Sequence, residues 1–314
     1  MASRSEGMQN LAKRADELAT QLDTVTVDND GERVSWLEIR GSGWIWHSTP
    51  LDVASPFARA MNTMPGAWVF TSATLSVKDS LSYFCNRLGV YEAEERILPS
   101  PFAYEDNALL YGPQGMPAPA SPDFDTAVVN EIVALVNAAD GGAFVLCTSY
   151  RAVRSYGQAL VDAGFSPLVQ GQASRASLLA DFRADENAVL VATSSFWEGV
   201  DLPGGILKAL VLTRLPFQVP TDPIVKARSD QFQDPFSEYS VPQAVLRFRQ
   251  GMGRLIRSKE DRGAIVVLDR RITARSYGKA FLQSTPPCTL EPCSLATVGA
   301  QAARWTGDGG GAKN

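Results

Sequence analysis

Several kinds of residue that would mark a particular class of protein are scarce in this chain of 314 residues. Its four cysteines are too few and too widely spaced for a disulfide framework, which favours a reducing compartment. No run of about 18 apolar residues occurs, so no membrane-spanning helix is expected. The opening residues lack the apolar stretch of a signal peptide. We therefore expect a soluble, cytoplasmic protein without a membrane partner.

Positive charge is scarce as well. The 29 Lys and Arg residues are outnumbered by 34 Asp and Glu residues, which gives a net charge of −5. This balance argues against a protein that coats nucleic acid through bulk positive charge, but it allows a local basic face. Hydrophobic residues make up 45% and charged residues 20%, the proportions of an ordinary globular protein. The length suits about two domains, each able to bury a core.

The first 95 residues mix helical and extended patterns. Apolar residues at helical spacing predict a helix over 10–22. Alternation over 34–38, and the segment 43–47 beyond a glycine turn, predict a β-hairpin. The apolar residues 67–70 predict a strand, followed by a helix from about residue 77.

From residue 123 onward, short apolar strands alternate with amphipathic helices. Strands are expected at 143–147, near 168, and at 188–192, 209–212 and 264–268. Helices are expected at 123–138, 150–163 and 175–184, from about 241, and at 275–283. This alternation is typical of a parallel sheet covered by helices on both faces, an α/β fold. Pro- and Gly-rich residues 112–122 predict a linker, and the Gly-rich last residues predict a flexible tail.

The segment 244–258 carries two stripes when it is drawn as one helix. The apolar stripe consists of Val245, Phe248, Met252 and Leu255. The polar stripe consists of Arg247, Gln250, Arg254 and Arg257. Gly251 and Gly253 each weaken such a helix by about 1 kcal/mol, which favours a site where a ligand approaches the backbone. Arginines three residues apart can converge on one phosphate, whereas the simpler alternative is a solvated basic face.

The segment 193–205 follows a predicted strand, where ligand-binding loops of parallel sheets collect. Hydroxyl groups able to hold a nucleic-acid phosphate come from Thr193, Ser194 and Ser195. Glu198 and Asp201 are suited to a ribose hydroxyl, a water molecule or Mg²⁺. The alternative is an ordinary acidic turn in which Phe196 only fills the core.

A third segment, 141–153, is a buried strand that opens into hydroxyl residues and a helix. Thr148, Ser149 and Tyr150 stand at the expected helix N-terminus, with Arg151 beginning the helix. Backbone amides and hydroxyls at such a terminus suit a DNA phosphate. By itself this pattern occurs in many α/β proteins.

Together and in this order, five sequence runs resemble a known family. They are SATL (72–75), FVLCTSY (144–150), SFWEGVDLPG (195–204), LTRLPFQVPTDP (212–223) and QGMGRLIRS (250–258). They are similar to the C-terminal motifs of superfamily 2 DNA helicases, in particular the DinG/YoaA branch, which is related to the XPD helicase. The resemblance runs from about residue 10 to about 290. It implies a RecA-like second motor domain and an ATP-dependent DNA helicase active in DNA repair and replication.

The resemblance also implies roles for individual positions. Coupling of ATP hydrolysis to DNA movement would involve Thr71, Ser72, Ala73 and Thr74. Nucleotide contact or relay would involve Glu198, Gly199 and Asp201. The ATP cleft would be lined by Gln250, Gly253, Arg254 and Arg257, the two arginines acting as fingers on the γ-phosphate. The DNA backbone would be contacted by Thr148, Ser149, Tyr150, Thr193 and Ser194.

Three features of the family pattern are missing from these residues. There is no G-x-x-x-x-G-K-[ST] loop to cradle ATP phosphates, no acidic quartet for Mg²⁺, and no group of four close cysteines for a 4Fe–4S cluster. All three belong to the N-terminal half of such helicases. We therefore expect a truncated chain that is inactive alone. Residues 1–95 would form the end of the first motor domain, and a linker would follow over 96–122. The second motor domain would occupy residues 123–290, and a flexible tail would occupy 291–314.

The expected cofactors are ATP and Mg²⁺, with a 4Fe–4S cluster only in the N-terminal half. Expected partners are single-stranded DNA and, from the YoaA-type resemblance, the chi subunit of the polymerase clamp loader. One alternative is a non-enzymatic, helicase-like module that binds DNA or a replisome partner. Another is an unrelated α/β nucleotide-binding enzyme, which leaves the glycine-interrupted arginine segment unexplained.

Overall fold

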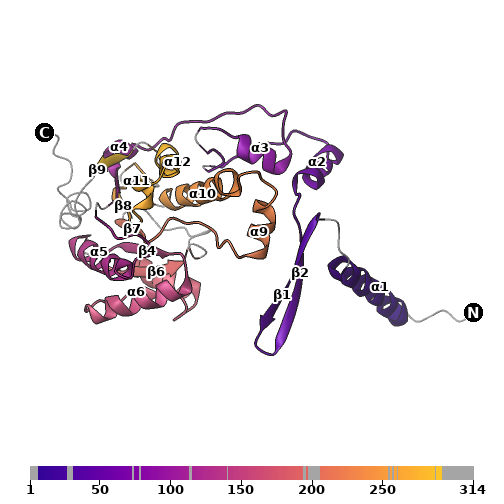
Figure 1. The fold of residues 1–314 in the computed structure, drawn as a ribbon, viewed down its shortest axis with the longest axis horizontal. Coiled ribbons are helices and arrows are strands. Elements are labelled where there is room, and N and C mark those ends of the chain that lie inside the picture. Colours follow the sequence, from indigo (N-terminus) through magenta and orange to yellow (C-terminus); the bar gives the residue numbers. More distant parts are fainter. Residues whose placement is uncertain are drawn as a thin grey trace, which may run out of the picture. The chain divides into compact units, whose positions relative to one another are not determined.

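The computed structural model describes most of the chain in detail. The described residues are 6–26, 31–72, 74–77, 79–112, 115–139, 141–193, 196, 206–253, 255–256, 258–259, 261–286 and 288–291. They fall into two compact units. The hairpin unit comprises Met1–Val69, Phe84–Ala93 and Gln218–Tyr239, and the sheet unit comprises Phe70–Tyr83, Glu94–Phe217 and Ser240–Asn314. Figure 1 labels their elements.

The hairpin unit contains helices and one antiparallel strand pair. Its elements are α1 (Glu6–Thr26), β1 (Arg33–Arg40), β2 (Gly43–Pro50), α2 (Ala54–Thr63), α9 (Pro223–Ser229) and most of α3 (Ser82–Leu88) and of the π-helix η1 (Pro235–Ser240). β1 and β2 pair in a register that brings Arg40 opposite Gly43. Gly41 turns the chain between them with φ +57°, a conformation that glycine adopts without strain. The predicted helix and hairpin are confirmed.

The predicted strand over 67–70 is wrong. These residues adopt neither helix nor strand, and Val69 is 81% exposed. Apolar composition alone does not make a strand, because its backbone groups must pair with a neighbouring strand. No described strand pairs with this segment. The helix expected from about residue 77 begins later, at Ser82.

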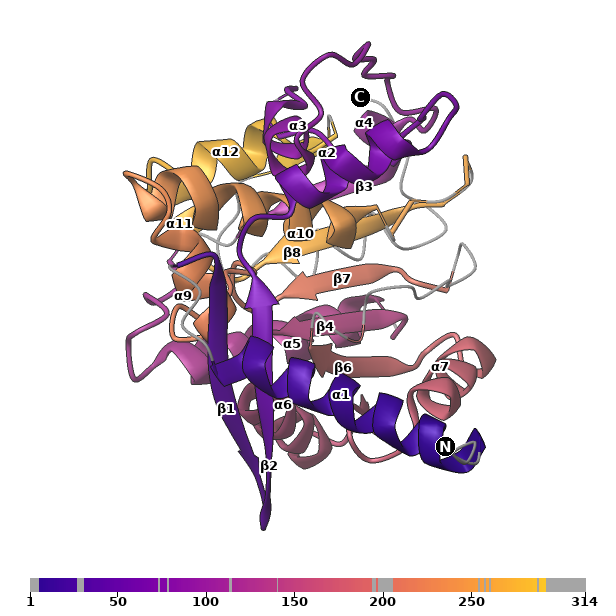
Figure 2. The same ribbon diagram turned by 90° about the vertical axis from the view of Figure 1, so that its right-hand side faces the viewer.

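The sheet unit contains a seven-stranded sheet in which every recorded pairing is parallel. Its strands are β3 (Ala108–Tyr111), β4 (Ala143–Cys147), β5 (Leu168–Val169), β6 (Val189–Thr193), β7 (Ala209–Leu212), β8 (Gly263–Val267) and β9 (Thr289–Glu291). Their order across the sheet is β5-β6-β4-β7-β8-β3-β9. Figure 2 shows β8, β7, β4 and β6 as neighbouring arrows. The expected α/β fold with a parallel sheet is confirmed.

Two helical layers bury the two faces of this sheet. Alternate side chains of β4 point to opposite faces, so Phe144 joins one core and Val145 the other. The first core is covered by α7 (Arg175–Ala184), α10 (Val241–Met252) and α12 (Gly278–Gln283). The second core is covered by α5 (Phe124–Ala139) and α6 (Tyr150–Asp162). Burying both faces explains why these strands are apolar along their whole length.

The predicted linker, 96–122, contains structure that the sequence patterns did not reveal. Its residues include the short helix α4 (Tyr104–Asn107) and β3, whose residues are all buried. β3 pairs with β8 on one side and with β9 on the other. The sheet therefore begins before residue 123, inside the segment expected to be a linker. The predicted tail lies almost wholly outside the described residues.

Within the ranges that the structure describes, no helix is both long and apolar enough to cross a membrane.

Candidate functional site

The carboxyl ends of the parallel strands meet at one edge of the sheet. The residues that end or follow β4, β5, β6, β7 and β8 there include Thr148, Gln170, Thr193, Thr213 and Asp269. β4 lies between β6 and β7, and the chain leaves it toward β5 on one side, whereas β7 leads to β8 on the other. This reversal is a topological switch point, where open parallel sheets bind ligands.

Three strands at this edge are joined by one hydrogen-bond network around Gln170. The backbone N–H of Thr193 donates to Gln170 Oε1 over 2.7 Å, and the Thr193 hydroxyl donates to the same atom over 3.0 Å. The other end of the amide donates from Nε2 to the Tyr150 hydroxyl over 3.3 Å. Tyr150 is 55% exposed, whereas Thr193 is buried. The amide of Gln170 thus links a buried strand end to an exposed aromatic hydroxyl.

Two helices begin beside this network, and each is capped by a serine. Ser149 accepts a hydrogen bond from Ala152 N at the start of α6, and Ser174 accepts one from Ser177 N at the start of α7. Exposed arginines stand in the first turns, Arg151 on α6 and Arg175 on α7. Helix N-termini with neighbouring guanidinium groups favour anions such as phosphate. Thr148, Ser149 and Tyr150 are all exposed at this position.

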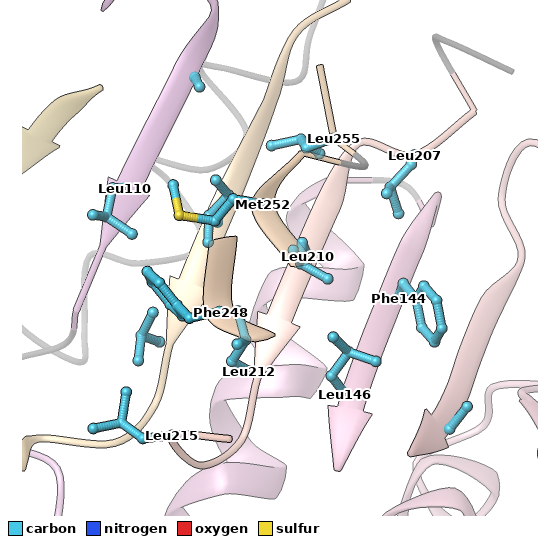
Figure 3. Close-up of a cluster of buried hydrophobic side chains, with 14 of the residues drawn as sticks. Leu110, Phe144, Leu146, Leu207, Leu210, Leu212, Leu215, Phe248, Met252 and Leu255 are labelled. Atoms are coloured by element: carbon cyan, nitrogen blue, oxygen red, sulfur yellow. The ribbon is translucent and has the colours of Figure 1, made fainter. Parts of the chain in front are cut away.

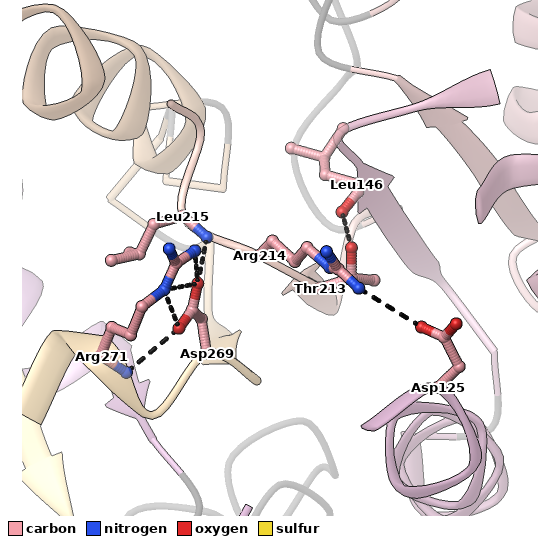
Figure 4. Close-up of polar contacts among 7 residues, drawn as sticks. All are labelled: Asp125, Leu146, Thr213, Arg214, Leu215, Asp269 and Arg271. Carbon is pink, nitrogen blue, oxygen red and sulfur yellow. Dashed lines mark hydrogen bonds and ion pairs between the residues drawn. The ribbon is translucent and has the colours of Figure 1, made fainter. Parts of the chain in front are cut away.

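The other half of the edge, at β7 and β8, is closed by charges (Figure 4). Asp269 is fully buried, and its carboxylate accepts from Leu215 N over 2.9 Å and from Arg271 N over 3.1 Å. The Arg271 guanidinium adds contacts of 2.5–3.0 Å to both carboxylate oxygens. The hydrogen bonds that Arg271 donates to Asp269 raise the pKa of Arg271 above its ordinary value. The buried carboxylate of Asp269, bonded to Leu215 N and to the partly exposed Arg271, fixes the LTRLPF loop to the end of β8.

Beside it, Arg214 lies at the switch point between β4 and β7. Its Nη2 is 3.6 Å from Asp125 Oδ1, and its guanidinium carbon lies 4.7 Å from the centre of the Phe124 ring. The Tyr156 hydroxyl donates to the same Asp125 oxygen over 2.7 Å. Burial, followed by the bond to Asp125, raises the pKa of Tyr156, so this phenol stays protonated. Asp125 therefore orients both groups at the start of α5.

The arginine segment is helical over only part of its predicted length. Phe248 and Met252 are fully buried over the sheet (Figure 3), and the whole apolar stripe Val245, Phe248, Met252 and Leu255 is buried as expected. However, α10 ends at Met252 and Gly253 is its C-cap, with N–H donating to Arg249 O. The prediction of one helix through residue 258 is therefore wrong. Gly253 caps the end of the helix, consistent with the low helix propensity of glycine, whereas Gly251 lies within its last turn.

Several predicted site residues lie outside the described residues. They are Ala73, Ser194, Glu198, Gly199, Asp201, Arg254 and Arg257. Of the predicted ATP-cleft residues, Gln250 and Gly253 are described, and both are exposed at the end of α10. Within the described ranges, no group of three or more His, Cys, Asp or Glu side chains could hold a metal ion. The roles of all these residues remain predictions.

The predicted coupling segment is described at Thr71, Ser72 and Thr74. Thr71 and Ser72 are exposed, and Ser72 Oγ accepts from Thr74 N over 3.2 Å. Two residues later the chain reaches Ser76, which is 6% exposed and bonded to Arg249 of α10.

Three residues that organise the site were missed in the sequence. Gln170 follows a strand of only two residues, Asp269 follows a strand without any recognised motif, and Arg249 lies between the two predicted stripes of α10. Gln170 and Asp269 offered one signal, their position just after a strand, because ligand-handling groups collect at carboxyl ends of parallel strands.

Comparison with known families matches residues 132–288, half of the chain, to the helicase C-terminal domain. The chain belongs to this family. The ATP-dependent DNA helicase YoaA of Haemophilus influenzae is 38% identical over 288 residues, which cover 90% of this chain and 45% of that protein. YoaA of Escherichia coli is 40% identical over 280 residues, covering 88% and 44%. The chain thus spans less than half the length of these two curated relatives.

Solved structures agree with the fold. An XPD helicase structure superposes with a TM-score of 0.62 at 14% identity, covering 93% of this chain and 56% of that one. The Xpd4 structure from S. tokodaii gives a TM-score of 0.51 at 16% identity, covering 80% and 51%. At such identities the likeness concerns the fold alone. The resemblance to the DinG/YoaA branch, first drawn from five sequence runs, is confirmed.

Proposed function

We propose that this chain is the C-terminal portion of an ATP-dependent DNA helicase and provides its second motor domain. The observation that carries the proposal is the Tyr150–Gln170–Thr193 network, which sits beside two capped helix N-termini at the carboxyl edge of a helicase C-terminal domain. Neutral donors, helix N-termini and nearby arginines suit the sugar–phosphate backbone of single-stranded DNA, which carries no sequence information there.

Within this proposal, the exposed residues at the start of α6 contact the DNA. Thr148, Ser149 and Tyr150 offer hydroxyls and backbone amides, and the exposed ring of Tyr150 can stack on a base. Thr193 has a different part, because its N–H and hydroxyl both donate to Gln170 and its side chain is buried. It holds Gln170 in place, and Gln170 orients the Tyr150 hydroxyl. Ser194 completes the predicted DNA contacts.

The nucleotide side of the proposal rests on the family resemblance. Bound ATP with Mg²⁺ would supply the phosphoanhydride bond whose hydrolysis drives movement. Gln250, Gly253, Arg254 and Arg257 would line the cleft, and Glu198, Gly199 and Asp201 would contact the nucleotide or relay its state. The sequence contains no G-x-x-x-x-G-K-[ST] loop, so the loop that holds the ATP phosphates, and any 4Fe–4S cluster, would belong to a part of the helicase outside these 314 residues. The chi subunit of the clamp loader is a further proposed partner.

The test compares the purified chain with a fusion. The fusion joins the N-terminal half of the E. coli YoaA relative, up to the matched region, to this chain. We expect negligible DNA-stimulated ATP hydrolysis by the chain alone and clear hydrolysis by the fusion. Arg254→Ala or Arg257→Ala in the fusion should abolish hydrolysis and leave single-strand binding largely intact. Robust hydrolysis by the chain alone, or equal loss of both activities, would overturn the proposal.

A further inference from the structure

The segment after the predicted coupling residues is bonded to the helix that leads to the predicted arginine fingers. Arg249 of α10 donates from Nη1 to the backbone carbonyl of Ser76 and, over 2.8 Å, to the Ser76 hydroxyl. Ser76 is 6% exposed and stands only two residues after Thr74. Arg249 stands four residues before Gly253, where α10 ends. One side chain therefore joins the two segments on which ATP-driven movement would depend.

The contact is part of a longer docking of residues 76–83 on α10. Gln243, in the first turn of α10, donates from Nε2 to the Tyr83 hydroxyl over 2.6 Å. Between these two anchors the chain makes a tight turn, with Val77 N donating to Ser80 O over 2.9 Å and Ser80 N donating to Val77 O over 3.1 Å. The side chain of Val77 packs against the core that α10 covers. Ser76 and Tyr83 are thus held by hydrogen bonds to α10, and Val77 is held by packing against the core.

The electrostatic surroundings of Arg249 favour a strong and directional hydrogen bond to Ser76. Its guanidinium is half-buried, and burial lowers the pKa of Arg249, while the nearby carboxylate of Asp79 acts in the opposite direction. A partly desolvated cation bonded to a backbone carbonyl makes a stronger and more directional contact than the same group in water. The opposite side of α10 is fixed on the sheet through Phe248 and Met252 (Figure 3). A displacement of Ser76 or Tyr83 would therefore displace α10 as a rigid helix.

We infer that Arg249 is a positioning residue that transmits movement between the coupling segment at Thr71–Thr74 and the end of α10. The inference rests on the proposed motor function, because the consequence of the tie is the coupling of hydrolysis to DNA movement. Arg249 itself touches neither nucleotide nor DNA in this role. Arg249 makes the segment after Thr74 and the end of α10 move together.

The contact is tested first in the 314-residue chain by hydrogen–deuterium exchange. Arg249→Met keeps the length of the side chain and removes its charge and donors. We expect exchange of the Val77 and Ser80 amides to accelerate at least about tenfold, because the turn is released from α10, while peptides from β4 and β7 keep their protection. Arg249→Lys should restore part of the protection. Arg275→Met, at an exposed arginine between α11 (Arg271–Ala274) and α12, is the matched control.

A double-mutant cycle identifies the partner. Ser76→Ala removes the hydroxyl and leaves the carbonyl, so it should accelerate exchange less than Arg249→Met. In the Arg249→Met background it should add almost nothing, because the two side chains act through one contact. Unchanged exchange of residues 76–83 in Arg249→Met, or additive effects of the two substitutions, would overturn the inference.

The coupling is tested in the fusion used for ATP hydrolysis. Arg249→Met should lower the number of base pairs unwound per ATP hydrolysed at least about fivefold, with partial rescue by Arg249→Lys. A merely structural contact would lower hydrolysis and unwinding together and leave this ratio unchanged, which would overturn the positioning role. A wild-type fusion without DNA-stimulated hydrolysis would contradict the proposed motor function instead, and the exchange measurement would still decide the contact.

Discussion

The two halves of the sheet's carboxyl edge use polar side chains in opposite ways. At β7 and β8, the fully buried carboxylate of Asp269 is surrounded by N–H donors from Leu215 and Arg271. At β4, β5 and β6, the network of Gln170, Thr193 and Tyr150 is neutral and reaches the surface, where Tyr150 is 55% exposed. One half directs its charges inward, and the other directs its hydrogen-bonding groups outward.

This difference suggests that one half of the edge stabilises the fold and the other half binds a ligand. A buried carboxylate is stable only when all its hydrogen-bond partners are present, so removing one of them lowers the free energy of unfolding. A neutral network that reaches the surface contributes less to folding than a buried carboxylate, and it keeps Tyr150 where a ligand can reach it. We therefore expect substitutions in the β7–β8 half to change stability, and substitutions in the β4–β6 half to change DNA affinity.

The largest effect is expected for Asp269→Ala. The substitution leaves the buried Leu215 N–H without its acceptor and removes the partner of the partly exposed Arg271 guanidinium, which should cost about 3 kcal/mol. The free energy of unfolding, measured by urea denaturation, should fall by that amount. Asp181→Ala, at an exposed position of α7, should change it by less than about 0.5 kcal/mol. A loss below about 1 kcal/mol for Asp269→Ala would show that the β7–β8 half is not held by charge.

A second buried carboxylate of the sheet unit sharpens this contrast. Glu131 of α5 is 5% exposed, and its Oε2 atom contacts no hydrogen-bond donor within the part of the chain that the structure describes. Burial raises the pKa of Glu131 from 4.5 to about 7. A carboxyl whose pKa is higher in the folded than in the unfolded protein binds its proton more tightly in the folded state. Stability should therefore fall as pH rises from about 4.5 to about 7.

Glu131→Gln should remove this pH-dependent loss. At pH 8 we expect the variant to exceed the wild type in unfolding free energy by on the order of 2 kcal/mol, and at about pH 4 the two should differ little. Urea denaturation at pH 4, 6 and 8 gives the comparison. A difference between the two proteins that stays constant across these values would contradict the raised pKa.

The strands and most helices of the sheet unit could be predicted because their signals are local. β4 and β7 have the predicted bounds, since a run of apolar residues between turn residues is enough to identify a strand buried on both faces. The apolar stripe of α10 was equally predictable from helical spacing. β3 was missed because it lies between a short helix and proline-rich residues, and only its pairing with β8 and β9 makes it a strand.

Individual residues of the candidate site could be predicted from the sequence, but the hydrogen bonds that connect them could not. Motif resemblance singled out Tyr150 and Thr193, which lie 43 residues apart in the sequence. Gln170, which bonds to both, follows a two-residue strand without a pattern of its own. The strand order places β5 and β6 on the same side of β4 and so brings the three residues together. Local sequence patterns do not reveal the order of strands in a sheet. The contact between Arg249 and Ser76 is hidden for the same reason, because 173 residues separate the two partners.

The smallest expected effect belongs to the β4–β6 half and concerns Gln170→Ala. The substitution removes the acceptor of Thr193 and the donor to Tyr150, so the affinity for a single-stranded oligonucleotide should fall about 2- to 12-fold, as expected for a hydrogen bond of about 0.5–1.5 kcal/mol. Fluorescence anisotropy at several salt concentrations measures it. Because an amide carries no charge, the slope of log K against log salt should not change, whereas Arg151→Ala should reduce that slope by about 1. A changed slope in Gln170→Ala, or unchanged affinity with retained stability, would mean that the outward-facing half of the edge does not contact DNA, and the contrast between the two halves would then concern stability alone.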